Sequence, residues 1–308
     1  MSTLKNKIDF AVIVSVNHAN PNGDPLNGNR PRVNFDGFGE LSDVSIKRKI
    51  RNRIMTMDGY TDSIFVQSDD NRNDDYRSLR QRAEGVLKNV DMKNDKKYRE
   101  AACKQWFDVR AFGQVFAYKA GKKGKKDDDA EGGDDKGVSI GIRGPVSIHP
   151  AFSVATVQDR ISSTQITKSV SGEGDGTKRG SDTMGMKHRV EHGVYVFYGS
   201  MNTQLADKTG FSDKDAEAIK EAIRTLFRND ASSARPEGSM SVFRVYWWGH
   251  NNPTGQHSSA KVHNAVRSKV GLGEGVTEPK DMGDYVYPSK EDVEKELPGL
   301  KCEVFEGE

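Results

Sequence analysis

Apolar residues follow strand and helix periods in a regular order along the first part of the chain. Residues 8–17 form a β-branched run of the kind that fills a central strand. A helix is expected over residues 42–57, because Ile46 and Ile50 begin an apolar stripe at helical spacing. A short strand is expected at residues 63–67. The polar segment between the first strand and the helix is rich in proline and glycine, so neither a helix nor a paired strand is expected there.

The same order returns near the other end of the chain. Strand patterns cover residues 194–201 and 240–248, and a helix between them begins with the capping-box pair Ser212 and Asp215. Strand–helix–strand repeated twice is the order of a split β-α-β, ferredoxin-like sheet. The predicted fold class is therefore α+β, with an antiparallel sheet of the type found in RNA-recognition motifs.

About 120 residues separate the two halves, which is too long for an ordinary connection and indicates a functional insertion. One or two helices are expected in residues 77–107, and strands in residues 108–118 and 138–157. Residues 121–137 carry lysine, aspartate and glycine almost exclusively, so a solvated, mobile loop is expected there.

Composition excludes several classes of protein. No apolar run approaches the ~18 residues of a membrane helix, and the first residues lack the apolar core of a signal peptide. Two cysteines, Cys103 and Cys302, make no disulfide framework and no zinc motif. We therefore expect a soluble cytoplasmic protein.

The formal net charge of +2 hides an asymmetry along the chain. Residues 273–308 hold eleven acidic residues against four lysines, a net charge of −7, so the other 272 residues carry +9. A basic body with an acidic tail fits a polyanionic partner, or simply a solvated surface with a charged tail.

One motif has the residue spacing of a catalytic zinc site but lies in a segment that is not expected to be helical. His188, Glu191 and His192 match the H-x-x-E-H pattern of a class of zinc peptidases. That chemistry needs a helix, whereas the sequence that follows is typical of a strand, where residues four apart lie about 13 Å from each other. No metal site and no enzyme signature is therefore predicted.

Two basic segments remain as candidate binding surfaces. On the predicted helix, Lys47, Arg48 and Arg51 form a cationic face that suits either a phosphate backbone or solvent. In the insertion, a polar stretch with flanking lysines and arginines carries Met184 and Met186. These methionines suit wedging between bases or packing on another subunit, or they dock on their own domain.

Several motifs, taken in order, resemble a known family. The segments at residues 19–25, 29–32 and 41–51, followed by those at 108–113, 141–150 and 186–195, are similar to the signatures of the backbone subunit of type I CRISPR interference complexes. This is the Cas-seven family of the RAMP superfamily, and the resemblance is to its type I-C branch. It spans about residues 8–250.

The resemblance implies a hand-shaped protein. It implies a palm made of residues 1–67 and 190–272, a finger insertion at 68–162 and a thumb loop at 163–189. The acidic tail at 273–308, read from the charge pattern, follows the palm. Copies would assemble head to tail along a CRISPR guide RNA and present it for pairing with target DNA, beside Cas-five, large and small Cascade subunits. No cofactor is implied.

The residues expected to bind RNA come from the first loop, the basic helix and the thumb. They are Asn20, Asn22, Arg30, Arg32, Lys47, Arg48, Arg51, Lys168, Met184, Met186, Lys187 and Arg189. Contacts to phosphates position RNA without reading its sequence, as a scaffold for arbitrary guides requires. The alternative is an RNA-cleaving subunit of the type III kind, which would use Asp24 or Asp36 of the first loop.

Overall fold

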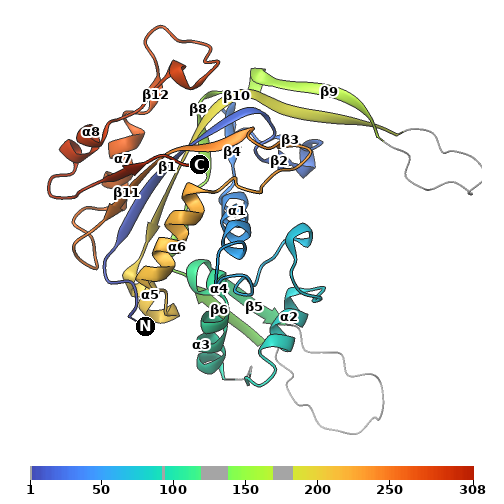
Figure 1. The fold of residues 1–308 in the computed structure, drawn as a ribbon, viewed down its shortest axis with the longest axis vertical. Helices are drawn as coiled ribbons and strands as arrows, with labels where there is room; N and C mark the ends of the chain where they lie inside the picture. The colour runs from blue at the N-terminus through green and yellow to red at the C-terminus, as the bar shows by residue number, and fades with distance from the viewer. Residues whose placement is uncertain (1, 92–93, 119–137, 169–182) are drawn as a thin grey trace, which may run out of the picture.

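The computed structural model describes residues 2–91, 94–118, 138–168 and 183–308. Its centre is an antiparallel sheet in the order β14-β11-β1-β10-β8-β4 (Figure 1). Two further strands, β7 and β9, pair with β10 outside this order. The strands are β1 (Ile8–Ala19), β4 (Phe38–Leu41), β7 (Val146–Ile148), β8 (Ala151–Thr156), β9 (Ile161–Lys168), β10 (Thr183–Met201), β11 (Met240–Gly249) and β14 (Glu303–Phe305). The predicted α+β class with an antiparallel sheet is confirmed.

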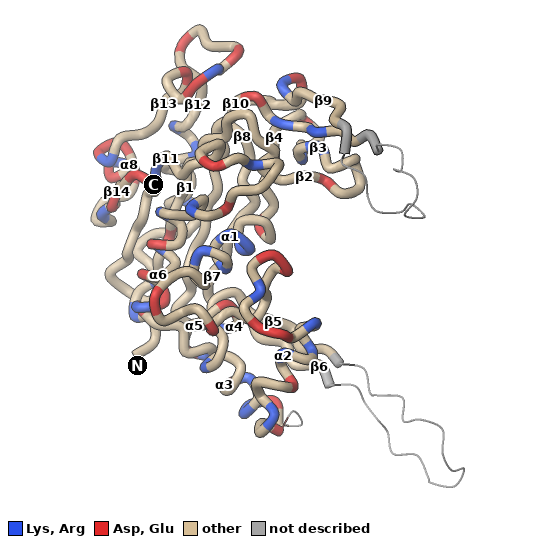
Figure 2. The backbone as a smooth tube through the Cα atoms, turned by 45° about the vertical axis from the view of Figure 1, so that its right-hand side comes forward, with Lys and Arg blue, Asp and Glu red and all other residues tan. Residues whose placement is uncertain are grey.

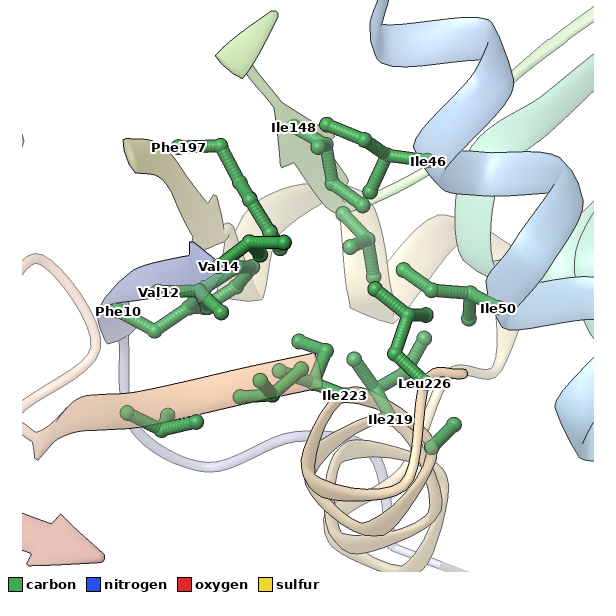
Figure 3. Packing of buried hydrophobic residues seen from close by; sticks show 14 of the residues in the cluster. Phe10, Val12, Val14, Ile46, Ile50, Ile148, Phe197, Ile219, Ile223 and Leu226 are labelled. Atoms are coloured by element: carbon green, nitrogen blue, oxygen red, sulfur yellow. The ribbon is translucent and has the colours of Figure 1, made fainter. Parts of the chain in front are cut away.

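Helices α1 (Asp43–Met55) and α6 (Asp213–Arg224) pack on one face of this sheet. Ile46 and Ile50 from α1 meet Ile219 and Ile223 from α6 over the β1 side chains (Figure 3). Both helices begin at a serine N-cap, Ser42 or Ser212, and the predicted capping box of α6 is present. Apolar stripes and caps in the sequence thus fix the position of both helices.

The opposite face is covered in part by the C-terminal region. Helices α7 (Ser259–Arg267) and α8 (Lys290–Glu296) bury a second apolar cluster that includes Trp248. Nearby, β12 (Gly271–Leu272) pairs with β13 (Tyr285–Val286). The acidic segment 273–308 is therefore part of the fold: it supplies β13, α8 and the edge strand β14, and it buries Leu297.

A third apolar cluster lies in the insertion and is built mainly around Trp106, Phe116 and Tyr98. Its elements are α2 (Leu79–Val86), α3 (Asp95–Gln105), α4 (Phe107–Phe112), β5 (Gly113–Tyr118) and β6 (Val138–Arg143). Arg110 attaches this unit to the main body through a bidentate pair with Asp215, at 2.7 and 3.2 Å. The short helix α5 (Thr203–Thr209) follows β10.

The structure corrects four local predictions. Residues 63–67 form no strand, and β7 and β8 take the place beside β10 instead. The first residues of 108–118 are helical, as α4. The proline-rich loop contains a small hairpin, β2 (Gly23–Asp24) with β3 (Arg30–Pro31), around a 3₁₀ turn, η1 (Pro25–Asn27). Residues 163–168 and 183–189 of the expected thumb loop belong to the strands β9 and β10.

Three short 3₁₀ turns complete the described elements: η2 (Asp69–Asn71), η3 (Gln158–Arg160) and η4 (Met282–Asp284). Within the described ranges, no helix combines the length and apolar character needed to cross a membrane. The predicted loop at residues 121–137 lies outside the residues that the structure describes.

Candidate nucleic-acid interface

The predicted thumb is a two-stranded arm. Strands β9 and β10 pair from Ile161 opposite Val190 to Lys168 opposite Thr183, and the arm projects away from the body (Figure 1). Lys168 and Met184 lie on these strands near the far end of the described arm. Met186 is 54% exposed, although it lies on a regular strand.

The two cations at the base of the arm are exposed. Lys187 and Arg189 lie two residues apart on β10, so they share one face of the arm. Arg189 lies 3.3 Å from Glu191, and Glu191 also contacts His18 at 2.6 Å. The neighbouring Ser162, His18 and Arg189 hold the pKa of Glu191 below its usual range, so this carboxylate offsets part of the charge of Arg189. Lys187 has no ion pair among the described residues and carries the free charge.

The first loop is tied to both the arm and the basic helix. Arg30 Nη1 lies 3.4 Å from Ser163 Oγ on β9, and Ser163 contacts His188 Nδ1 at 2.7 Å across the arm. Burial and the neighbouring Arg30 lower the pKa of His188, so the ring is neutral at pH 7. Asn22 Oδ1 accepts from the amide and hydroxyl of Ser42, the N-cap of α1, at 2.9 Å each. The loop therefore contacts both the arm and the N-cap of α1.

Asn20 and Arg32 make contacts within the loop. Asn20 is 2% exposed and donates to the carbonyl of Asn29 at 2.7 Å. Arg32 faces Asp24 at 3.5 Å. Asn20 and Arg32 thus have partners within the loop, and Arg30 is a loop cation that contacts the arm.

Two of the three cations on the basic face of α1 are already in ion pairs with carboxylates of this chain. Lys47 pairs with Asp43 at 2.9 Å, one helical turn earlier. Arg51 donates to the buried carboxylate of Asp108 at 2.8 Å and lies 5.0 Å from the ring centre of Phe112. Figure 2 marks lysines and arginines along α1 in blue. Among them, Arg48 is exposed and has no ion pair among the described residues, so it is the available cation of this face.

The two candidate nuclease carboxylates lie in turns. Asp24 caps η1 by accepting from the amide of Leu26 at 3.2 Å. Asp36 is exposed, and its own amide bonds to Asn34 Oδ1 in the turn before β4. No group of three His, Cys, Asp or Glu side chains with metal-binding geometry occurs in the described part of the chain.

The H-x-x-E-H residues lie on strand β10, in the strand conformation that the sequence predicts and not on a helix. His192 Nδ1 contacts Asn17 Oδ1 at 2.6 Å, whereas His188 contacts Ser163. The two rings therefore have separate partners.

One surface was missed at the sequence level. Phe152 on β8 is 42% exposed beside a cavity of about 440 Å³, which also borders Tyr198 and Arg267. The aromatic residues of this sheet face are spread over β8 and β10, so no single strand shows an aromatic motif. Only the pairing of the two strands brings them together.

Comparison with known proteins assigns the sequence to a family. Residues 6–289 match the family model described as CRISPR-associated protein Cas7. A CRISPR-associated protein Cas7 from Haloferax volcanii is 29% identical over 240 residues, covering 76% of this chain and 67% of the relative.

Two solved chains from CRISPR RNA-guided surveillance complexes are also similar. One, from a pre-nicking complex, has a TM-score of 0.47 and 13% identity, and the match covers 94% of this chain and 87% of that one. The other has a TM-score of 0.44 and 15% identity, with 98% and 89% covered.

Proposed function

This chain belongs to the CRISPR-associated Cas7 family, and we propose that it is the guide-RNA-binding backbone subunit of a type I-C Cascade surveillance complex. Copies bind head to tail along the CRISPR RNA, because a heterologous interface that does not close generates an open helix. The bound guide then pairs with target DNA, and base pairing supplies the specificity. The subunit acts as a scaffold and not as a nuclease.

The hydrogen-bonded meeting of three basic segments carries this proposal. Arg30, Arg48 and Lys187 come from the first loop, α1 and the arm, and hydrogen bonds through Asn22 and Ser163 join these segments. Cations spread over separate segments suit an extended phosphate backbone. Met186, exposed on the arm, would wedge against the bases.

The proposed division of the chain is the one that the family resemblance implies, and β7 and β8 of its insertion join the central sheet. The sheet with α1 and α6 would be the RNA-recognition-like palm, residues 1–67 with 190–272. The insertion at 68–162 has its own cluster around Trp106 and would form the fingers. The arm at 163–189 would be the thumb. The remaining partners are the Cas-five, large and small subunits.

Charge reversal at Arg48 and Lys187 tests the RNA surface. We expect the double variant Arg48→Glu, Lys187→Glu to weaken binding of a single-stranded guide RNA at least tenfold and to flatten its salt dependence, because about two phosphate contacts are lost. Both side chains are exposed, so the thermal unfolding midpoint should not change.

The matched control carries the same charge change elsewhere. Lys208 and Lys214 are exposed, on α5 and α6, without an ion pair among the described residues. The variant Lys208→Glu, Lys214→Glu should bind RNA within threefold of the parent chain. An equal loss of RNA affinity in both double variants would contradict a specific RNA-binding surface at Arg48 and Lys187.

Native mass spectrometry with RNAs of increasing length and magnesium tests the scaffold role. Complex masses should rise in whole-protein steps with the RNA intact. Discrete RNA fragments that disappear in Asp24→Ala or Asp36→Ala would instead establish a nuclease.

A further inference from the structure

The sheet face opposite α1 and α6 is only partly covered. Helix α7 packs over β1 and ends at Arg267, and beyond it β10 and β8 border a cavity of about 440 Å³. This cavity lies across the sheet from the basic helix α1.

Three exposed side chains surround the cavity: His149, Phe152 and Arg267. Its floor is apolar, with Val196, the strand partner of Phe152, and the largely buried ring of Tyr198. No acidic residue is among the described residues that line it.

Arg267 gives the rim a positive charge. Its guanidinium carbon lies 4.6 Å from the ring centre of Tyr198, and it has no ion pair among the described residues. A guanidinium held on an aromatic ring keeps its outer N–H groups available for an anion. The rim thus presents a cation beside an exposed aromatic ring.

We propose that this cavity binds a nucleotide, with the base stacked on Phe152 and the phosphate paired with Arg267. An exposed ring above an apolar floor fits the π-face of a base, and such stacking tolerates any base. A cavity of this size is within the range of sites for small ligands. The nucleotide is either free or one unit of a single strand, and the site is separate from the proposed guide-RNA surface.

Saturation-transfer NMR with AMP tests the site. We expect signals from the base protons, and an AMP affinity reduced at least tenfold in Phe152→Ala but retained in Phe152→Trp, which keeps a stacking ring. Arg267→Gln should weaken AMP and leave adenosine unchanged, because adenosine lacks the phosphate.

Two matched controls separate the site from general effects. Phe35 is fully exposed on the turn before β4, and Lys261 is exposed on α7, so Phe35→Ala and Lys261→Gln should leave AMP binding unchanged. A tetra-adenylate that binds at least tenfold more tightly than AMP, with the same loss in Phe152→Ala, identifies a strand unit as the ligand. Equal affinities identify a free nucleotide.

The absence of transfer to AMP and to the tetra-adenylate would overturn the inference, as would equal affinities in Phe152→Ala and the parent chain. Assembly on guide RNA by the parent chain is measured separately by native mass spectrometry. If assembly occurs while the AMP signals are absent, only the nucleotide site is wrong.

Discussion

At the scale of single residues, the buried carboxylate of Asp108 joins α4 to Arg51 of α1. It is 1% exposed and accepts from the amides of Phe65 and Val66, at 2.7 and 3.0 Å, as well as from Arg51. Three donors converge on one buried carboxylate, so its removal leaves both a buried cation and two amides unsatisfied.

We expect Asp108→Ala to lower the free energy of unfolding by about 3–5 kcal/mol, as for a broken buried ion pair. Urea denaturation followed by circular dichroism measures the change. The exposed pair of Arg80 and Glu84, at 2.8 Å on α2, gives the control. Glu84→Gln should cost less than about 1 kcal/mol, and an equally small cost at Asp108 would show that Arg51 is held by other contacts.

The two cysteines should be unreactive in the folded protein. Cys103 and Cys302 are 4% and 1% exposed, and burial raises the pKa of their thiols to about 11 and about 12. Because the thiolate is the reactive form, we expect negligible labelling by a thiol reagent at pH 8 and complete labelling in urea. Rapid labelling of either residue in the native protein would show that its cluster opens.

The residue scale also shows the limit of prediction from sequence. Lys47, Arg48 and Arg51 look equivalent on a helical wheel, yet Arg51 is paired with Asp108, 57 residues away. A contact of that separation depends on how the insertion returns to the body, which no local pattern contains. The ion pair of Lys47 with Asp43 could be predicted from the sequence, since the two residues are one helical turn apart.

At the scale of elements, strong local signals predicted helices well. The stripe of Ile46 and Ile50 and the capping box at Ser212 each fixed a helix to within a few residues. The prediction at residues 63–67 was wrong because a short apolar run also suits a buried loop, and here Phe65 is buried against Trp106. Whether such a run becomes a strand or a buried loop depends on tertiary contacts, which the local pattern does not contain.

The docking of α7 on the sheet should be sensitive to pH. His263 is 2% exposed on α7, donates to the carbonyl of Gly199 at 3.0 Å, and lies 3.6 Å from Asp9. Burial is the main cause that lowers the pKa of His263 below its ordinary value of 6.5, and the neighbouring His149 and Arg267 act in the same direction. The folded protein therefore holds this ring neutral.

As the pH falls below about 6.5, the unfolded chain takes up a proton at this histidine that the folded protein resists. The free energy of unfolding should thus be highest above pH 6.5 and decrease below it, by at most about 1.4 kcal/mol per pH unit for each such group. His192 adds to this slope because burial also lowers its pKa. Urea midpoints between pH 7.5 and 5 measure it.

His263→Gln keeps a donor for Gly199 and removes the titrating ring. Its urea midpoint should change less between pH 6.5 and 5 than that of the parent chain. An identical pH dependence in the two proteins would assign the slope to other groups, such as His192.

At the scale of the whole molecule, the acidic C-terminal segment contributes both negative charge and buried apolar side chains. Composition alone treats residues 273–308 as a tail with a net charge of −7. In the structure, Val293, Leu297 and Leu300 of this segment are buried against the sheet, and β14 pairs with β11. Glu308 also pairs with Arg224 and Arg228 of the body. Its acidic side chains are therefore held beside a basic body by a folded scaffold.

Two variants distinguish the packing role of residues 273–308 from the effect of their charge. Deletion of residues 273–308 exposes the cluster around Trp248, so we expect a product that aggregates or binds a hydrophobic dye, because each large side chain exposed costs about 1.5–3 kcal/mol. The triple variant Glu274→Gln, Glu291→Gln, Glu306→Gln changes exposed side chains only. It should keep the parent unfolding midpoint.

The triple variant should also bind single-stranded RNA more tightly, since three charges that repel phosphates are gone. The gain should shrink as salt is raised, because screening weakens the same repulsion in the parent chain. Fluorescence anisotropy at 50 and 300 mM salt measures both effects. A soluble deletion product with an unchanged melting point would contradict the packing role. If RNA affinity at low salt stays unchanged in the triple variant, these charges lie too far from the RNA surface to act on it, and the acidic segment serves the fold alone.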